Sequence, residues 1–276
     1  LGRLIYSWRM DKALNDPLAP LLGPTDPAPF EIVNLDGSAG VVLICDHASR
    51  TVPECLHHLG LGPEVFDRHI GYDIGAAEVA RLLSRRLDAP LVLAGFSRLV
   101  IDLNRPIDHP DSIVEEIDNT PIPGNLGLNM TAREERDREL YAPYHGAIGR
   151  VLDAVMARAR PPVLFSVHSF SPGYGAAPRP WDIGVLWNRD PRLAQPLMER
   201  LADAGLNVGD NEPYSGRDMA NTIDLHGGQA GLANCVIEIN QDQVRDPEGI
   251  GRWARILGDI MVEILAIDGL NRIEQF

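Results

Sequence analysis

Two histidines, His47 and His168, stand at the ends of apolar runs, and each is followed by a small residue. The runs, residues 40–45 and 162–167, are apolar and partly β-branched, and they predict strands that are buried on both faces. Open α/β sheets bind ligands at the carboxyl ends of their strands. If the two strands are parallel neighbours, their ends lie about 5 Å apart, which lets two imidazoles share one zinc ion. The alternative is that each histidine is a hydrogen-bonded core residue.

A catalytic zinc ion needs a third protein ligand and an open position for water. Asp46 is adjacent to His47, and its side chain is expected to point away if the strand geometry continues. A helix is predicted over Asp73–Leu87, directly after the segment 69–72, and we expect Asp73 at its start to be the third ligand. The alternative role for Asp73 is to cap the amino terminus of that helix.

Glu238 lies in the middle of an otherwise apolar predicted strand, Asn234–Asn240. Burial of a carboxylate without a partner is costly, and a buried carboxyl group tends to have a raised pKa. Such a group suits a general base that takes a proton from zinc-activated water and later donates it to a leaving amine. The alternatives are that Glu238 faces solvent on an edge strand or pairs with an arginine.

Three side chains that can bind a carboxylate flank the apolar run Leu99–Leu103, which predicts a further strand. They are Arg98, Asn104 and Arg105. Arginine and asparagine together can hold a carboxylate through forked hydrogen bonds. The ordinary alternative for each of them is a solvated surface position.

The composition excludes several classes of protein. A net charge of −14 leaves no basic surface for a nucleic acid. Three cysteines without a C-x-x-C pair favour neither a disulfide framework nor a thiolate zinc site. Residues 1–10 do not resemble a signal peptide, and no run approaches the roughly 18 apolar residues of a membrane span. There is no G-x-S-x-G or phosphate-binding glycine motif. We therefore expect a cytoplasmic protein with no membrane or nucleic-acid partner.

Predicted strands alternate with helical patterns along the chain, which favours the α/β class: a single domain with a twisted, mixed, mainly parallel sheet and helices on both faces. Residues 1–39 are expected to form an irregular lead-in with an edge strand at 31–35, and residues 40–276 the domain that contains the site. The polar segment 107–130 has the length of a lid or binding loop. A capping box at Thr131–Glu134 predicts the start of the next helix.

Several blocks, taken in order, lie between residues 38 and 265: DHAS (46–49), HIGYDIGA (69–76), SRLVIDLNRP (97–106), SVHSF (166–170), NEPYSG (211–216), HG (226–227) and VIEINQD (236–242). In this combination the chain resembles the N-formylglutamate amidohydrolase family. The resemblance implies a fold akin to that of zinc carboxypeptidases and aspartoacylase. It also implies hydrolysis of an N-formyl or N-acyl amino acid, such as N-formyl-L-glutamate, with one bound zinc ion.

The resemblance also implies roles for individual residues. His47 and His168 correspond to the metal-binding histidines, and Glu238 to the general base. Arg98 would stabilise the oxyanion, while Asn104 and Arg105 would hold the α-carboxylate of the substrate. The side chains expected to contact the anionic N-acyl amino acid are Ser49, Arg50, Asn104, Arg105, Tyr214 and His226.

The sequence departs from the wider fold group at one position. That group takes its acidic metal ligand from an H-x-x-E motif, and here Arg50 occupies the place of the acid, so Asp73 is the expected third ligand. Two other functions stay open. The chain could be a hydrolase of another amide, such as a small peptide or a cell-wall fragment, or a non-catalytic binder of acylated amino acids.

Overall fold

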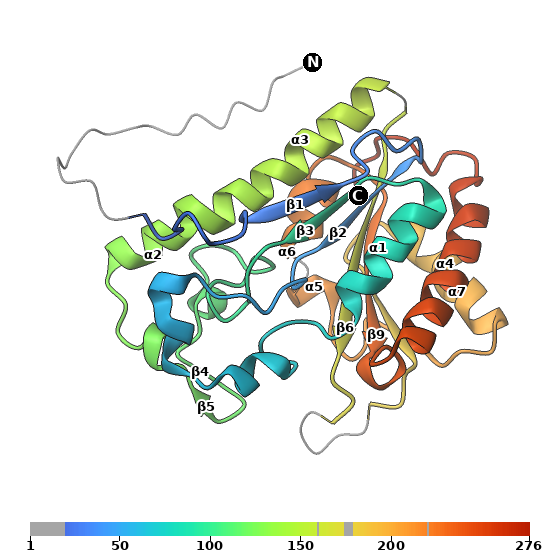
Figure 1. The fold of residues 1–276 in the computed structure, drawn as a ribbon. Helices are drawn as coiled ribbons and strands as arrows, with labels where there is room; N and C mark the ends of the chain where they lie inside the picture. Colours follow the sequence, from blue (N-terminus) through green and yellow to red (C-terminus); the bar gives the residue numbers. More distant parts are fainter. Residues whose placement is uncertain (1–19, 159, 174–178, 220) are drawn as a thin grey trace.

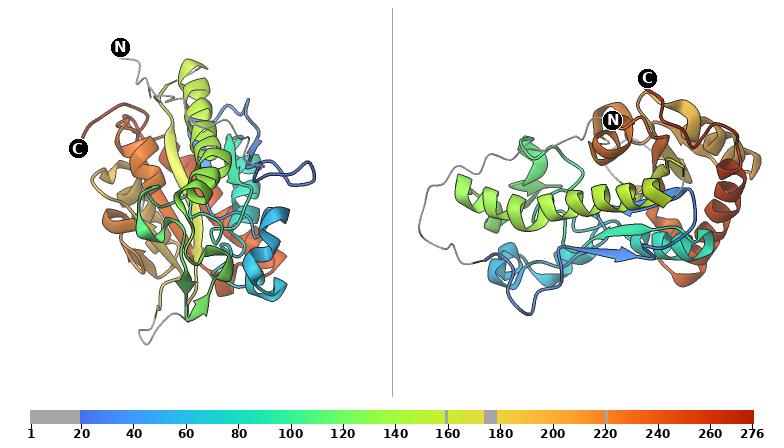
Figure 2. Two further views of the ribbon diagram at one scale, coloured as in Figure 1. Left: turned by 90° about the vertical axis from the view of Figure 1, so that its left-hand side faces the viewer. Right: turned by 90° about the horizontal axis from the view of Figure 1, so that it is seen from above.

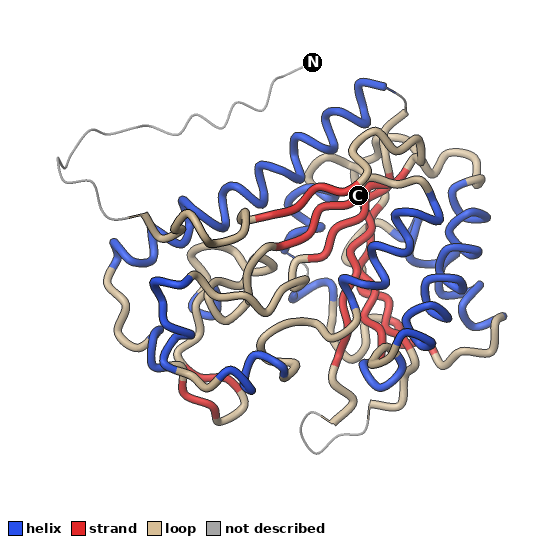
Figure 3. Tube along the Cα trace, in the orientation of Figure 1, coloured by secondary structure: helices blue, strands red, loops and turns tan. Residues whose placement is uncertain are grey.

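The computed structural model describes residues 20–158, 160–173, 179–219 and 221–276. Seven strands form one sheet in the order β1-β3-β2-β6-β9-β7-β8 (Figures 1 and 3). Their bounds are Phe30–Val33 (β1), Val41–Cys45 (β2), Leu91–Ala94 (β3), Val163–Phe170 (β6), Ile183–Leu186 (β7), Val208–Asp210 (β8) and Asn234–Asn240 (β9). A separate hairpin consists of β4 (Glu116–Ile117) and β5 (Thr120–Pro121).

The four central strands β3, β2, β6 and β9 are parallel to one another. Antiparallel pairing joins β1 to β3 and β7 to β9. The predicted mixed, mainly parallel sheet in a single domain is therefore confirmed. The predicted edge strand at 31–35 is β1, which lies at the edge of the sheet. Residues 1–19 of the predicted lead-in lie outside the described residues.

Strand β2 is buried on both of its faces, as its continuous apolar run predicts. Val41, Leu43 and Cys45 pack into one hydrophobic core, and Val42 and Ile44 pack into a second core on the opposite face of the sheet. All five side chains are 0% exposed. This burial fixes the direction and the depth of the strand that leads to His47.

Helices cover both faces of the sheet (Figures 1 and 2). The helices against the first core are α1 (Ala76–Leu87), α4 (Pro191–Asp203) and α7 (Pro247–Leu265). Against the second core lies α3 (Ala142–Arg158), which continues from α2 (Met130–Arg136) through a π-helical turn (Asp137–Tyr141). The short helices α5 (Gly216–Met219) and α6 (Asn221–Ile223) lie between β8 and β9 in the chain. None of the helices described is long and apolar enough to cross a membrane.

Helix α1 begins three residues later than the sequence predicts. Its first residue is Ala76, and the preceding residue, Gly75, has a φ of 77°. A Cβ atom at Gly75 would lie 2.3 Å from the carbonyl oxygen of Val244, so glycine is required there both for the left-handed backbone and for space. The side chain of Asp73 consequently does not cap the helix and is free to turn toward the sheet.

The capping box predicted at Thr131–Glu134 is wrong. Helix α2 begins at Met130, and its N-cap is Asn129, whose side-chain oxygen accepts a hydrogen bond from the backbone N–H of Ala132 at 2.9 Å. Asparagine is as good an N-cap as serine or threonine, and it stands two residues earlier in the sequence.

The strand predicted over Leu99–Leu103 is also wrong, because this segment forms turns. The N–H of Val100 bonds to the carbonyl of Ser97 at 2.9 Å, and the N–H of Asp102 bonds to the carbonyl of Ser112 at 2.7 Å. The apolar side chains of the segment are nevertheless buried in the second core. An apolar run indicates that a segment is buried but does not by itself distinguish a strand from a loop. Here the buried segment is a loop, and a hydrogen bond to Ser112 helps to hold it.

Asn271, near the carboxyl end of the chain, joins the amino ends of two strands, whereas His47 lies beyond the carboxyl end of one of them. Its side-chain nitrogen donates to the carbonyl of Gly40 at 2.8 Å and to the carbonyl of Pro161 at 2.9 Å. These two residues precede β2 and β6. The contact therefore ties together the starts of the neighbouring strands that lead to the two histidines.

Candidate metal centre

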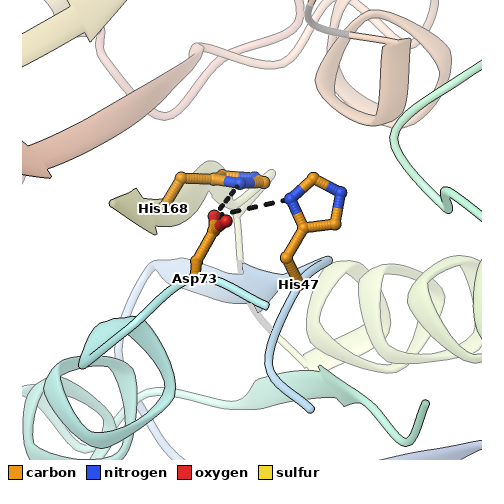
Figure 4. A group of neighbouring side chains, drawn as sticks. All are labelled: His47, Asp73 and His168. Carbon is orange, nitrogen blue, oxygen red and sulfur yellow. Dashed lines mark hydrogen bonds and ion pairs between the residues drawn. The ribbon is translucent and has the colours of Figure 1, made fainter. Parts of the chain in front are cut away.

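Three buried side chains, His47, Asp73 and His168, form a compact group that can hold a metal ion (Figure 4). One potential ligand atom from each residue lies within 4.8 Å of the other two. The Oδ2 atom of Asp73 lies 2.8 Å from Nδ1 of His168 and 3.4 Å from Nδ1 of His47. These are the three residues that the sequence predicts as ligands.

The sheet brings the two histidines together because β2 and β6 are parallel neighbours, with Ile44 opposite Ser166. His168 lies within β6, and His47 follows the end of β2 by two residues. Asp73 comes from the loop before α1, and its backbone N–H donates to the carbonyl of His47 at 3.0 Å. The backbone of Asp73 is thus bound to His47, the same residue that the side chain of Asp73 faces.

A carboxylate meets the far nitrogen of each imidazole. Nε2 of His47 lies 2.8 Å from Oδ1 of Asp102, and Nε2 of His168 lies 3.0 Å from Oδ2 of Asp46. Both acids are buried. Such outer carboxylates fix the tautomer and the orientation of metal-binding histidines.

These two acids differ from the sequence expectations. The expectation that Asp46 points away is wrong. Its carboxylate lies on the sheet face of Val42 and Ile44, where it contacts His168 and Tyr144, and His47 turns to the same side because β2 ends at Cys45. Sequence reasoning missed Asp102. Asp102 has the same sequence pattern as Glu238, which is a single acid inside an apolar run. In both places the pattern indicates a buried carboxylate.

The residues present fit a divalent metal ion. Nδ1 of His47 is buried and has no hydrogen-bond partner in the part of the chain that the structure describes. When Nε2–H donates to Asp102, Nδ1 carries a lone pair, and that lone pair is directed toward the carboxylate of Asp73. A cation between two acceptors that face each other in a buried site stabilises both of them. Two imidazole nitrogens and one carboxylate oxygen are a usual ligand set for catalytic zinc.

Glu238 lies beside this group because β6 and β9 are in parallel register, with His168 opposite Glu238. It is 8% exposed, and no described residue forms a hydrogen bond with its buried Oε2 atom. Burial raises the pKa of Glu238 to about 7, although the nearby His168 opposes the shift. A carboxyl group with this pKa can both accept and donate a proton at neutral pH.

Arg98 is held at the same site by two carboxylates. Its Nη2 donates to Oδ2 of Asp102 at 2.7 Å, and its Nη1 lies 3.6 Å from Oδ1 of Asp73. Burial disfavours the charged form, but these acids prevail and raise the pKa of Arg98. The guanidinium therefore stays positive beside the ligand group.

These side chains surround a cavity of about 310 Å³. The metal-ligand group, Glu238 and Arg98 all line it, and so do three predicted substrate contacts, Asn104, Arg105 and Tyr214. Ile117 and Asp118 of the β4–β5 hairpin also line the cavity, so part of the segment predicted as a lid or binding loop does reach the site.

Three other predicted substrate contacts lie outside the lining of this cavity and have other partners. The hydroxyl of Ser49 accepts a hydrogen bond from the N–H of Thr51 at 3.1 Å. Arg50 forms an exposed ion pair with Asp67. Nε2 of His226 lies 2.9 Å from Nδ1 of His145, and burial lowers the pKa of His226 to about 4.

A family model described as N-formylglutamate amidohydrolase matches residues 39–245 of the chain. The chain belongs to the N-formylglutamate amidohydrolase family. The resemblance seen in the sequence blocks is thereby confirmed. Within this member of the family, the blocks that contain His47, Asp73, His168 and Glu238 converge on one cavity.

Several solved structures are similar to this family member. One is the crystal structure of the gene product Atu2144 from Agrobacterium tumefaciens, with 34% sequence identity, a TM-score of 0.86, and coverage of 89% of this chain and 98% of that chain. Another is an N-formylglutamate amidohydrolase from Ralstonia eutropha JMP134, with 20% identity, a TM-score of 0.67, and coverage of 87% and 97%. The second likeness supports the fold. A search of the curated proteins finds no match.

Proposed function

We propose that this protein hydrolyses the amide bond of an N-formyl or N-acyl amino acid such as N-formyl-L-glutamate, with zinc as its divalent metal ion. One observation carries the proposal. A buried ligand group, in which Nδ1 of His47 has no hydrogen-bond partner among the described residues, lies next to a buried carboxyl group, Glu238, in one cavity. Membership of the N-formylglutamate amidohydrolase family and the name of the relative from Ralstonia eutropha support the choice of reaction.

His47, Asp73 and His168 are the residues that would hold the ion. When bound there, zinc supplies a Lewis acid that polarises the acyl carbonyl and acidifies water at the site. Asp102 and Asp46 accept hydrogen bonds from the far nitrogens of the two imidazoles and keep both rings in the ligand orientation.

Glu238 is the general base of the proposed reaction. Its Oε2 atom accepts a proton from the attacking water and then donates it to the nitrogen of the leaving amine. The raised pKa of about 7 suits both steps, since catalysis by proton transfer is most efficient when the pKa lies near the working pH. Glu238 is the register partner of His168, a proposed metal ligand, on the neighbouring strand.

Arg98 stabilises the negative charge that develops on the acyl oxygen. Its guanidinium is fixed by Asp102 and Asp73 before the substrate arrives, so little reorganisation accompanies the reaction. Arg98 lines the cavity, and its side chain is 23% exposed, which leaves part of the group open to a ligand.

The α-carboxylate of the substrate binds to Asn104 and Arg105, with Tyr214 as a further contact. All three line the cavity. Arg98 and Arg105 both line the cavity, and their guanidinium groups suit an anionic substrate. Ser49, Arg50 and His226 lie outside the cavity lining, so the proposed substrate contact rests on the three lining residues.

A panel of N-acyl amino acids tests the proposal. The purified protein, loaded with zinc, is incubated with compounds that vary in acyl length and in amino-acid side chain, and the release of free amine is measured. We expect turnover that depends on zinc and is greatest for short acyl groups on acidic amino acids. A His47→Ala variant, checked for folding by circular dichroism, serves as the metal-deficient control.

Two outcomes would overturn the proposal. If no compound in the panel releases amine, the protein is not an amidohydrolase of this substrate class. If calorimetry then detects binding of the same compounds without turnover, the protein is a binder of acylated amino acids. Turnover that is equal in the wild type and in His47→Ala would reject the metal site.

A further inference from the structure

Arg179 makes two contacts that fix Tyr214 at the wall of the cavity. Its Nη1 donates to the hydroxyl oxygen of Tyr214 at 3.1 Å, and its guanidinium carbon lies 4.9 Å from the centroid of the tyrosine ring. The same Nη1 donates to the carbonyl of Ser171 at 2.9 Å, just beyond the end of β6. Arg179 therefore links the end of the strand that contains His168 to the loop that contains Tyr214.

The donor and acceptor chemistry of this contact determines where the tyrosine proton points. A guanidinium group has only N–H donors, so the hydroxyl oxygen of Tyr214 must be the acceptor. The O–H proton is then left to bond elsewhere, and no described residue accepts it in a hydrogen bond. Tyr214 lines the cavity, where Glu238 and Arg98 are close enough to influence its ionisation.

We propose that Arg179 is a positioning residue, which holds the hydroxyl group of Tyr214 so that its proton is donated to an oxygen of the bound substrate. The inference rests on the proposed function for the identity of that substrate, an N-acyl amino acid. Cation–π contact and hydrogen bonding act together, because Arg179 contacts both the ring and the hydroxyl group.

A double-mutant cycle on the zinc-loaded enzyme tests this role. Tyr214→Phe removes the proposed donor and should lower kcat/KM by about ten- to a hundredfold, the usual effect of one hydrogen bond to a charged group. Arg179→Met should cause a similar loss in the wild-type background and less than about a twofold loss in the Tyr214→Phe background. Additive losses would overturn the coupling, and an unchanged kcat/KM in Tyr214→Phe would overturn the donor role.

Arg217→Met is the matched control, since Arg217 also lies over an aromatic ring, at 6.0 Å from Trp187, but outside the cavity lining. This variant should keep the wild-type kcat/KM. Chemical rescue separates positioning from general stability: millimolar guanidinium chloride should restore activity to Arg179→Ala but not to an Arg179→Ala, Tyr214→Phe double variant. Rescue of both, or of neither, would overturn the proposal.

A spectroscopic readout keeps this inference distinct from the proposed function. The ultraviolet difference spectrum between the wild type and Tyr214→Phe reports the ionisation of this tyrosine alone. Loss of the Arg179 cation should move that ionisation to higher pH in Arg179→Met. If the wild type lacks turnover on the whole panel, the proposed function fails, and this titration still decides whether Arg179 controls Tyr214.

Discussion

His168 and Glu238 lie side by side on neighbouring parallel strands, as register partners of β6 and β9. One is a candidate metal ligand, and the other is the proposed general base. Because both belong to buried strands in the centre of the sheet, their spacing is set by backbone hydrogen bonds and not by a flexible loop. The site is therefore rigid where proton transfer requires it.

Replacement of Glu238 by glutamine should separate metal binding from turnover. The amide cannot accept the proton from water, so we expect kcat to fall by about 10²- to 10⁴-fold while zinc binding persists. Zinc content by atomic absorption and amine release measure the two effects. Glu248→Gln, an exposed position at the start of α7, is the control and should behave as the wild type. Normal turnover in Glu238→Gln would remove Glu238 from the mechanism.

The raised pKa of Glu238 should make the free energy of unfolding of the metal-free protein depend on pH. The carboxyl group of Glu238 loses its proton near pH 4.5 in the unfolded chain and near pH 7 in the folded one. Between these values the folded state holds the extra proton, so wild-type stability should fall as the pH rises through this window. The change corresponds to about 3 kcal/mol.

Urea unfolding at pH 5 and pH 8, after removal of metal by chelation, checks this expectation. The stability of Glu238→Gln relative to the wild type should increase between the two pH values, because glutamine does not titrate. A difference between the two proteins that stays constant with pH would show that the pKa of Glu238 is not raised.

Asp102 should control metal affinity without being a ligand. It accepts a hydrogen bond from the far nitrogen of His47 and also holds Arg98, so Asp102→Asn disturbs the orientation of both. We expect zinc affinity to fall by about 10- to 100-fold, as measured by competition with a chelator. Asp108→Asn, the same change at an exposed position, should have no effect. Equal affinities for the two variants would exclude an orienting role for Asp102.

Arg105 should act on substrate binding more than on chemistry. We expect Arg105→Met to raise KM for an N-acyl amino acid by about 10- to 100-fold, the effect of one lost charge-assisted hydrogen bond. The corresponding substrate with a neutral α-carboxamide should show little difference between variant and wild type. Arg255→Met, at an exposed position on α7, is the control. A selective loss in kcat would reassign Arg105 to the transition state.

Much of this arrangement could be predicted from the sequence, because it depends on strands. The apolar runs before His47 and His168 indicate buried strands, and the rule for the carboxyl ends of parallel strands places the two histidines together. Glu238 could also be predicted, because burial of a single acid in an apolar strand is costly and indicates a functional role. Asp73 follows from the need for a third ligand.

The parts that could not be predicted depend on loops and on distant contacts. The apolar segment Leu99–Leu103 resembles a strand in sequence. Its backbone instead forms a hydrogen bond with Ser112 and a turn that begins at Ser97. This conformation lets the side chain of Asp102 reach His47. Likewise, the prediction for Asp46 assumed that the strand alternation continues through His47, two residues beyond the end of β2. The role of Arg179 depends on the ring of Tyr214, 35 residues away in the chain.

The contact of Asn271 with the starts of β2 and β6 has a practical consequence for work on this enzyme. The two strands that it joins are the ones that present His47 and His168 at their other ends. Trimming the chain to the region matched by the family model would delete this clamp. Expression vectors for activity assays should therefore retain the segment after α7, and affinity tags or reporter fusions placed there need a spacer.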